Sequence, residues 1–131
     1  MAKIMIVDDN KEFLEELGET LSLSGYDVVA VNESVAAFET ACNTKPDIVL
    51  LDLKMSGKTG FKVADEIKHY TELKHVPIIA MTGHFTDLEY SLLINICGIK
   101  KCLVKPFNPL DVIAQIENLL QEDKNISRRN V

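Results

Sequence analysis

The chain has 131 residues, of which 47% are apolar and 26% are charged, and its formal net charge is -6. This length and composition suit one compact domain, and we expect the negative charge to exclude a broad affinity for nucleic acid or anionic lipid. The N-terminus has no apolar stretch of signal-peptide length and no segment reaches the roughly 20 apolar residues of a membrane span, so we expect a cytoplasmic protein.

Short apolar runs along the chain predict β-strands. Each run is brief and rich in β-branched residues, and those in the middle of the chain are apolar on both alternating faces, as in a parallel sheet covered on both sides. The runs lie at residues 3–7, 27–31, 47–51, 76–81 and 100–104.

Helical patterns separate these strands, because apolar residues recur there at three- and four-residue steps. Gly25 ends the first helix, and Pro46 and Pro77 mark two helix-to-strand connections. In chain order the stripes expected to face the core are Leu14, Leu17 and Leu21; Val35, Phe38 and Cys42; Val63, Ile67 and Tyr70; and Leu110, Ile113, Ile116 and Leu120.

The alternation of strands and helices predicts a doubly wound α/β sandwich, because right-handed crossovers place helices on both faces of a parallel sheet. The sequence shows no internal repeat and no low-complexity linker. We therefore assign residues 1–122 to one domain and expect residues 123–131 to form a polar C-terminal tail.

The cysteines and histidines do not form a recognisable metal or disulfide pattern. The three cysteines are odd in number, lack CxxC spacing and lie in apolar segments, so we interpret them as small buried side chains. The three histidines share no ligand spacing, and we expect them to be solvated. These residues are Cys42, Cys97 and Cys102, and His69, His75 and His84.

Polar side chains follow four of the predicted strands. Asp8 and Asp9 follow the first strand, and Asp52, Thr82 and Lys105 end the third, fourth and fifth. We expect them to converge, because ligands of open α/β sheets bind at the carboxyl ends of the strands. Three close carboxylates resist joint ionisation unless a cation joins them, and their hard oxygens suit Mg²⁺. A phosphoryl group could then be held on a carboxylate nucleophile.

Four motifs occur in the order and strand context of a known family. They are "VDD", "LLDLKMSGKTG", "MTG" and "KPF". Through them residues 1–122 resemble the receiver domain of two-component response regulators, in its stand-alone, chemotaxis-regulator-like form. The resemblance implies a flavodoxin-like fold, with a five-stranded parallel sheet in the order 2-1-3-4-5 and five helices.

The resemblance also implies a role for each polar residue. Asp52 would accept a phosphoryl group from a phosphohistidine of a sensor kinase or phosphotransfer protein. Lys105 would pair with the phosphoryl oxygens, Thr82 would hydrogen-bond one of them, and the bond from Lys105 to Pro106 would be cis. Mg²⁺ would be bound directly by Asp9 and Asp52, through water by Asp8, and by the carbonyl oxygen of Lys54.

Each residue also has a plain structural interpretation. Asp9 could cap the following helix, since Glu12 lies three residues on, and Asp52 could cap a turn before "SGKTG". Lys105 alone would be a surface lysine, and Thr82 alone an ordinary strand residue. The combination favours a functional site, because helix capping would explain only one of the adjacent aspartates Asp8 and Asp9.

The sequence departs from the usual pattern of the family in a few places. Ser56 stands where a proline commonly follows the methionine, and Cys102 stands where an aromatic residue usually turns inward on activation. Lys54 and His84 occupy positions that flank the phosphoryl group in the family that the sequence resembles. We expect their long side chains to hinder the attacking water and so to lengthen the phosphoryl lifetime. The alternative is that their positive charge orients that water and shortens the lifetime.

Three functions are considered for this sequence. The preferred one is a stand-alone, Mg²⁺-dependent phosphorylation switch or relay that has no output domain and catalyses only its own phosphoryl chemistry. A small Mg²⁺-dependent aspartyl phosphatase would need a substrate pocket and a leaving-group acid, which the sequence does not show. A phosphate-independent receiver-like binding module would not need the intact set of polar residues.

The predicted fourth helix, "TDLEYSLLINICG", carries two apolar stripes. A helix outside a sheet can bury one of them, so the other would face outward and meet a second copy or a partner after phosphorylation. A rotated or shortened helix that hides this stripe is the alternative. The stripe expected to be buried is Tyr90, Leu93, Ile94 and Cys97, and the outward stripe is Leu88, Leu92 and Ile96.

Overall fold

The computed structural model describes residues 1–84, 86–95, 97–99 and 101–129, and for residues 93, 94 and 123–129 it describes the backbone alone. The elements alternate as expected, and each predicted strand agrees with an observed one to within two residues at either end. They are β1 (Lys3–Val7), α1 (Lys11–Leu23), β2 (Asp27–Val31), a 3-10 turn η1 (Ser34–Ala36), α2 (Ala37–Thr44), β3 (Ile48–Asp52), α3 (Gly60–Lys68), β4 (Ile78–Thr82), α4 (Asp87–Asn95), β5 (Lys101–Val104) and α5 (Pro109–Arg129).

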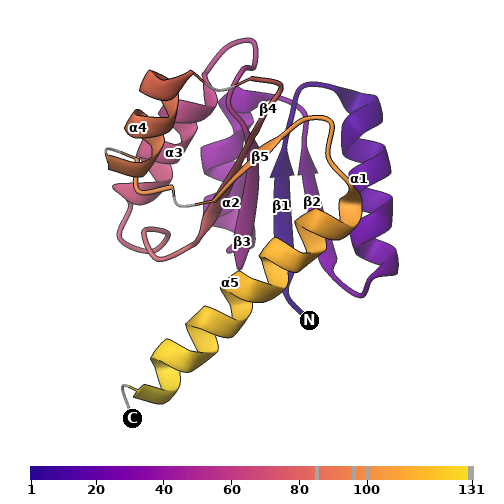
Figure 1. Cartoon of the computed structure of the whole chain (residues 1–131), viewed down its shortest axis with the longest axis vertical. Coiled ribbons are helices and arrows are strands. Elements are labelled where there is room, and N and C mark those ends of the chain that lie inside the picture. The colour runs from indigo at the N-terminus through magenta and orange to yellow at the C-terminus, as the bar shows by residue number, and fades with distance from the viewer. Residues whose placement is uncertain (85, 96, 100, 130–131) are drawn as a thin grey trace.

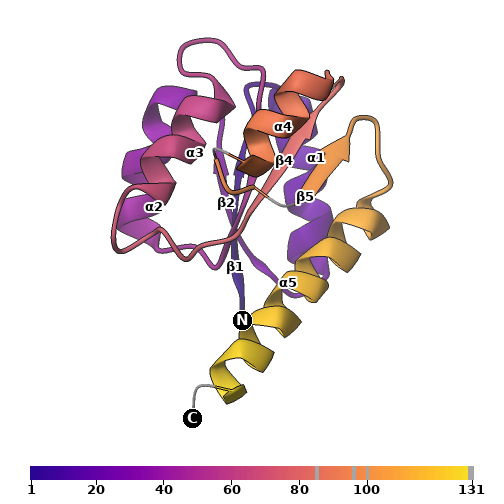
Figure 2. The same cartoon turned by 60° about the vertical axis from the view of Figure 1, so that its left-hand side comes forward.

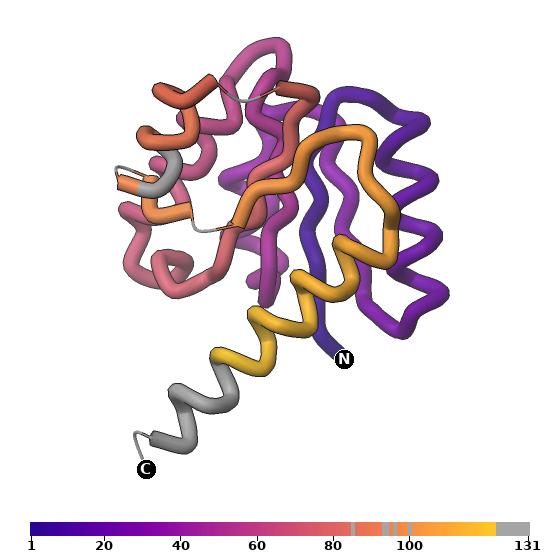
Figure 3. Tube along the Cα trace, in the orientation of Figure 1, coloured from indigo at the N-terminus to yellow at the C-terminus, as the bar shows by residue number. Residues whose placement is uncertain are grey.

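The strands form one parallel sheet in the order β2-β1-β3-β4-β5, which confirms the flavodoxin-like topology. Every residue of β3 and β4 is buried, as the unbroken apolar runs predict. Figure 3 follows the chain from β1 inside the sheet to β2 at one edge and then across to β3. The reversal of strand order therefore falls between β1 and β3.

Two helical layers cover the sheet. Figures 1 and 2 show α1 and α5 on one face and α2, α3 and α4 on the other. The first face buries the predicted stripe Leu14, Leu17 and Leu21 against Ile4 and Ile6. The second face is a separate apolar cluster of residues from α2, α3 and the alternate positions of the strands. Both faces are thus packed, and the strand ends are left for polar groups.

Two predicted stripes are rotated in the structure. Val35 falls in η1 and is 58% exposed, so α2 instead buries Ala37 and Ala41, with Phe38 and Cys42 only partly covered. The 3-10 turn delays the start of α2 and shifts the phase of the stripe. This part of the prediction is wrong because the turn has no signature in the apolar pattern.

In α5 the first predicted position is also wrong. Leu110 is 69% exposed because it lies in the first turn of the helix, whereas Val112 and Ile116 face the sheet with Leu119. The predicted Ile113 is only partly buried. Similarly, Val63 and Ile67 are buried in α3, but Tyr70 lies past its end and is 38% exposed.

The C-terminal helix, the cysteines and the histidines can also be compared with the sequence prediction. The backbone of α5 is helical through Arg129. Cys97 is buried, Cys42 and Cys102 are half-buried, and burial raises the pKa of the Cys97 and Cys102 thiols. The three histidines are exposed, as expected.

Among the described residues, no helix combines the length and apolar character needed to cross a bilayer.

Candidate functional site

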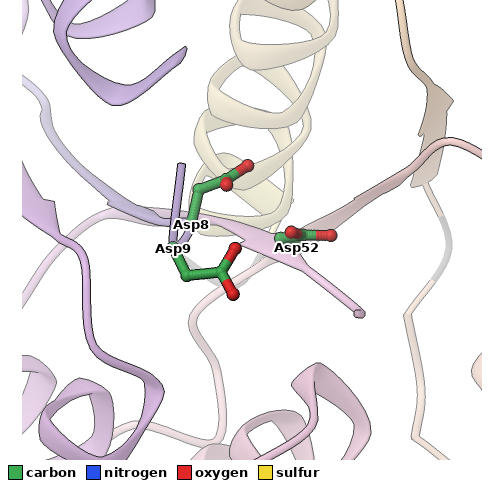
Figure 4. Close-up of side chains that lie close together, drawn as sticks. All are labelled: Asp8, Asp9 and Asp52. Atoms are coloured by element: carbon green, nitrogen blue, oxygen red, sulfur yellow. The ribbon is translucent and has the colours of Figure 1, made fainter. Parts of the chain in front are cut away.

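Three carboxylates meet at the carboxyl edge of the sheet. Asp8 and Asp9 follow β1 and Asp52 ends β3, and each offers an oxygen within 4.8 Å of the others. Figure 4 shows the pair from β1 beside the side chain from the neighbouring strand. Asp8 and Asp52 are 1% and 6% exposed, whereas Asp9 is open to solvent. The strand order therefore brings together residues that are more than forty positions apart.

Lys105 and Thr82 complete the group at the same edge. The Lys105 ammonium donates a hydrogen bond to Asp8 Oδ2 and lies 3.7 Å from Asp52 Oδ2. It also lies 4.1 Å from the centre of the Phe13 ring. Thr82 is buried, and its carbonyl oxygen accepts a 2.7 Å hydrogen bond from the Lys105 N–H. The peptide bond from Lys105 to Pro106 is cis, as predicted.

Backbone N–H groups fix the three carboxylates. The N–H of Asn10 donates to Asp8 over 2.9 Å, that of Lys54 to Asp52 over 3.2 Å, and that of Ser56 to Asp9 over 3.1 Å. The loop after β1 contributes one donor and the loop after β3 contributes two, and these bonds limit the freedom of the acids before any ligand binds.

The capping interpretation of Asp9 is wrong. The N-cap of α1 is Asn10, whose side-chain oxygen accepts a 3.1 Å hydrogen bond from the N–H of Phe13. Asp9 instead extends away from the helix toward the loop that contains Ser56. Neither Asp8 nor Asp9 is therefore explained by the helix that follows them.

Gly60 brings the start of α3 against the end of β3. Its N–H donates to the Leu53 carbonyl, and a Cβ at this position would lie 2.6 Å from Leu53 Cα and closer still to the carbonyl oxygen of Asp52. No side chain fits there without displacing backbone. Thr59 begins the helix by accepting a hydrogen bond from the Lys62 N–H. The motif "SGKTG" was available in the sequence, but only the structure shows this close approach.

The electrostatics of the edge favour a cation. Burial raises the pKa of Asp52, and Asp8 and Asp9 raise it further, while the Lys54 N–H and the Lys105 ammonium lower it in part. When all ionised, three carboxylates and one ammonium leave two net negative charges. Hard oxygen donors with this charge fit Mg²⁺, which accepts a few carboxylates and keeps several waters. The residues present therefore fit the expected metal.

Comparison with known proteins agrees with this geometry. The family model described as "Response regulator receiver domain" matches residues 4–117. The chain belongs to this family. The CpxR homolog of Haemophilus influenzae, a transcriptional regulatory protein, is 32% identical over 127 residues, covering 97% of this chain and 54% of that protein. The chain thus spans about half the length of this relative.

Solved structures of similar proteins have the same fold. The chemotaxis protein CheY4 of Vibrio cholerae has a TM-score of 0.85 at 26% identity, covering 90% of this chain and 98% of that one. A response regulator receiver domain protein from Clostridium thermocellum has a TM-score of 0.85 at 28% identity, covering 96% of this chain and 99% of that one.

The residues expected to modulate the receiver chemistry lie at different depths. Lys54 and His84 are exposed, in the loops that follow β3 and β4. Cys102 is half-buried and packs against the same apolar cluster as Cys97 and Ile99. No partner for the Lys54 side chain is predicted from the sequence, but its ammonium lies 3.6 Å from a carboxylate oxygen of Glu89 in α4.

The predicted outward stripe of α4 is observed in part. Leu88 is 71% exposed and Leu92 is half-buried, and Ile96 lies outside the described residues. Of the stripe expected to be buried, Cys97 is buried but Tyr90 is 47% exposed, so the prediction is wrong for Tyr90. The side chains of Leu93 and Ile94 lie outside the described residues. This short helix therefore exposes apolar side chains in more than one direction.

A groove that the sequence analysis missed adjoins the site. Its volume is about 590 Å³, and it runs between α1 and the loop from β5 to α5. Phe13 and Phe107 pack edge to face across it, with ring centres 5.8 Å apart. Because its walls come from two distant segments, no local pattern indicates it. The lining residues are Phe13, Glu16, Leu17, Thr20, Lys105, Pro106, Phe107 and Pro109.

Proposed function

We propose that this receiver domain is a phosphorylation-driven switch or relay whose acceptor is Asp52. The donor is a phosphohistidine on a sensor kinase or a phosphotransfer protein in the cytoplasm. The observation that carries the proposal is the setting of Asp52: a carboxylate that is 6% exposed, 3.7 Å from an ammonium and grouped with two further acids. Burial of a charged carboxylate costs stability, so a carboxylate in this setting indicates a functional site.

The chemistry follows from the groups at this edge. A carboxylate oxygen of Asp52 attacks phosphorus, a P–O bond forms, and the P–N bond to the imidazole breaks with its electron pair returning to nitrogen. The Lys105 ammonium lies beside the attacking oxygen and neutralises charge on the phosphoryl oxygens. Bound Mg²⁺ would neutralise charge on the equatorial oxygens. The direct ligands would be Asp9, Asp52 and the carbonyl oxygen of Lys54, and Asp8 would act through a water molecule.

The test is the intact mass of the protein after incubation with Mg²⁺ and acetyl phosphate. A gain of one phosphoryl group supports the switch. Unlimited hydrolysis of the donor would instead indicate a phosphatase, and no change in either would indicate a phosphate-independent binding module. Asp52→Asn should abolish the gain, whereas Asp27→Asn, which alters an exposed acid on β2, should leave it intact.

The same proposal gives α4 the role of the output surface. The buried Thr82 ends β4 just before the loop that leads to α4, so its hydrogen bond to a phosphoryl oxygen would shift that loop and then the helix. We propose that the exposed end of α4 at Leu88 then meets a second copy of the chain. Leu88→Glu with Leu92→Glu should abolish self-association of the labelled protein in sedimentation and leave labelling intact. Self-association that survives both charges excludes this surface.

A further inference from the structure

Lys54 contacts both the acceptor and α4. Its backbone N–H donates to Asp52 Oδ1 over 3.2 Å, so the residue lies next to the acceptor carboxylate. Its ammonium points elsewhere and lies 3.6 Å from Glu89 Oε2. Within the described part of the chain, Glu89 is the one acid that forms an ion pair with Lys54. The acceptor loop and the start of α4 are thus joined by one side chain.

Glu89 is held in place independently of Lys54. Its Oε1 accepts a 3.1 Å hydrogen bond from the Thr86 N–H, and its own N–H donates to Thr86 Oγ1 over 3.1 Å. This reciprocal pair is a capping box at the start of α4. The Thr86 N–H and the Lys54 ammonium lower the pKa of Glu89, which keeps the carboxylate charged. One oxygen therefore serves the helix cap, and the other faces Lys54.

We propose that Glu89 is a positioning residue for the phosphoryl chemistry at Asp52, because it draws the Lys54 ammonium toward α4. A phosphoryl group on Asp52, with its higher negative charge, competes with Glu89 for that ammonium. When the phosphoryl group holds Lys54, the first turn of α4 loses its tie to the acceptor loop. This inference rests on the proposed function and adds to it a device that links the acceptor to the helix.

The chain offers variants that separate the ion pair from the cap. Glu89→Gln removes the charge that attracts Lys54 but keeps an amide oxygen that can accept from the Thr86 N–H. Lys54→Met removes the ammonium and keeps an apolar chain of similar length. Glu72→Gln is the matched control, because Glu72 pairs with Lys45 at the opposite edge of the sheet.

The measurement is the rate at which labelled protein loses its phosphoryl group after the donor is removed. Water attacks phosphorus in this step, and inorganic phosphate leaves as the Asp52 carboxylate is restored. Glu89→Gln should slow the loss about threefold, in line with the modest energy of a partly exposed ion pair, because Lys54 is then available to the phosphoryl group. Lys54→Met should speed the loss, and Glu72→Gln should not change it.

The decisive comparison introduces Glu89→Gln into the Lys54→Met background. There it should change neither the rate of phosphoryl loss nor the melting temperature. An equal effect in both backgrounds would show that Glu89 acts through the cap and would overturn this inference. An unchanged rate of phosphoryl loss for Glu89→Gln in the wild-type background would also overturn this inference. If Asp52 still takes the label in that experiment, the proposed function stands. Failure of the wild-type chain to take any label would overturn both.

Discussion

The two edges of the sheet carry the same kinds of charged residues in opposite settings. At the carboxyl edge Lys105 pairs with Asp8, and their side chains are 22% and 1% exposed. At the amino edge Lys45, which caps α2 just before β3, pairs with Glu72, and their side chains are 52% and 61% exposed. Exposed pairs of this sort contribute little to stability, whereas a buried acid that loses its cation is costly. Burial of the charges, and not the presence of a pair, therefore distinguishes the carboxyl edge from the amino edge.

The acids at the two edges differ in the same way. Asp47 at the amino edge is exposed and accepts a 2.7 Å hydrogen bond from the Lys3 N–H, so it serves the local backbone. Asp52 is buried at the other end of the same strand, and its pKa is raised chiefly by that burial. The carboxyl edge is thus kept at a cost to stability, as expected of a site built for a ligand.

The largest effect that sharpens this contrast is expected at Gly60. Gly60→Ala places a methyl group against the backbone of Asp52 and Leu53, so we expect a loss of about 3 kcal/mol in the free energy of unfolding. Gly18→Ala in α1 is the control, because its new methyl group would meet only Val28 at 3.6 Å, and it should raise stability slightly. Urea unfolding measures both. Equal stability of the two variants would mean that the acceptor loop is not packed this tightly.

A smaller effect is expected from the two lysines. Lys105→Met should destabilise the protein by about 2 kcal/mol at neutral pH without Mg²⁺, because it leaves Asp8 buried without a cation. Lys45→Met should cause no measurable change. Addition of Mg²⁺ should recover part of the loss for Lys105→Met, since the metal replaces the missing positive charge. Similar losses for both lysines would remove the distinction between the edges.

The smallest effect concerns pH. The pKa of Asp52 is raised in the folded protein, so the native state binds a proton more readily than the unfolded chain, and stability is lost as pH rises through the folded pKa. Asp52→Asn removes that loss, and we expect its melting temperature at neutral pH without metal to be about 3 °C higher. The gain should shrink as the pH falls toward the ordinary carboxyl range. A gain in melting temperature that does not change with pH would instead show that altered packing causes it.

The fold and most of the site were predictable from the sequence for one physical reason. Buried parallel strands are short apolar runs, and the residues that end them must meet at one edge once the strands are parallel. Asp8, Asp52, Thr82 and Lys105 could therefore be placed together without coordinates, and the structure confirms that these residues converge.

The remaining features depend on geometry that the apolar pattern does not record. The phase of α2 is set by a 3-10 turn that exposes Val35, and α1 is capped by Asn10 instead of Asp9. The ion pair between Lys54 and Glu89 joins the loop after β3 to α4, although the Thr86 and Glu89 spacing of a capping box could have indicated the start of α4. Contacts between distant segments become visible only in the folded chain.

The most direct test of the central claim is to locate the phosphoryl group on the chain. An acyl phosphate on an aspartate is reduced by borohydride to homoserine, which marks the residue that carried it, and peptide mass mapping then identifies its position. After labelling with acetyl phosphate and Mg²⁺, we predict homoserine at position 52, and none at positions 8 and 9. Homoserine at either of those positions, or its absence from the chain despite a stable gain of one phosphoryl group, would contradict the assignment of Asp52 as the acceptor.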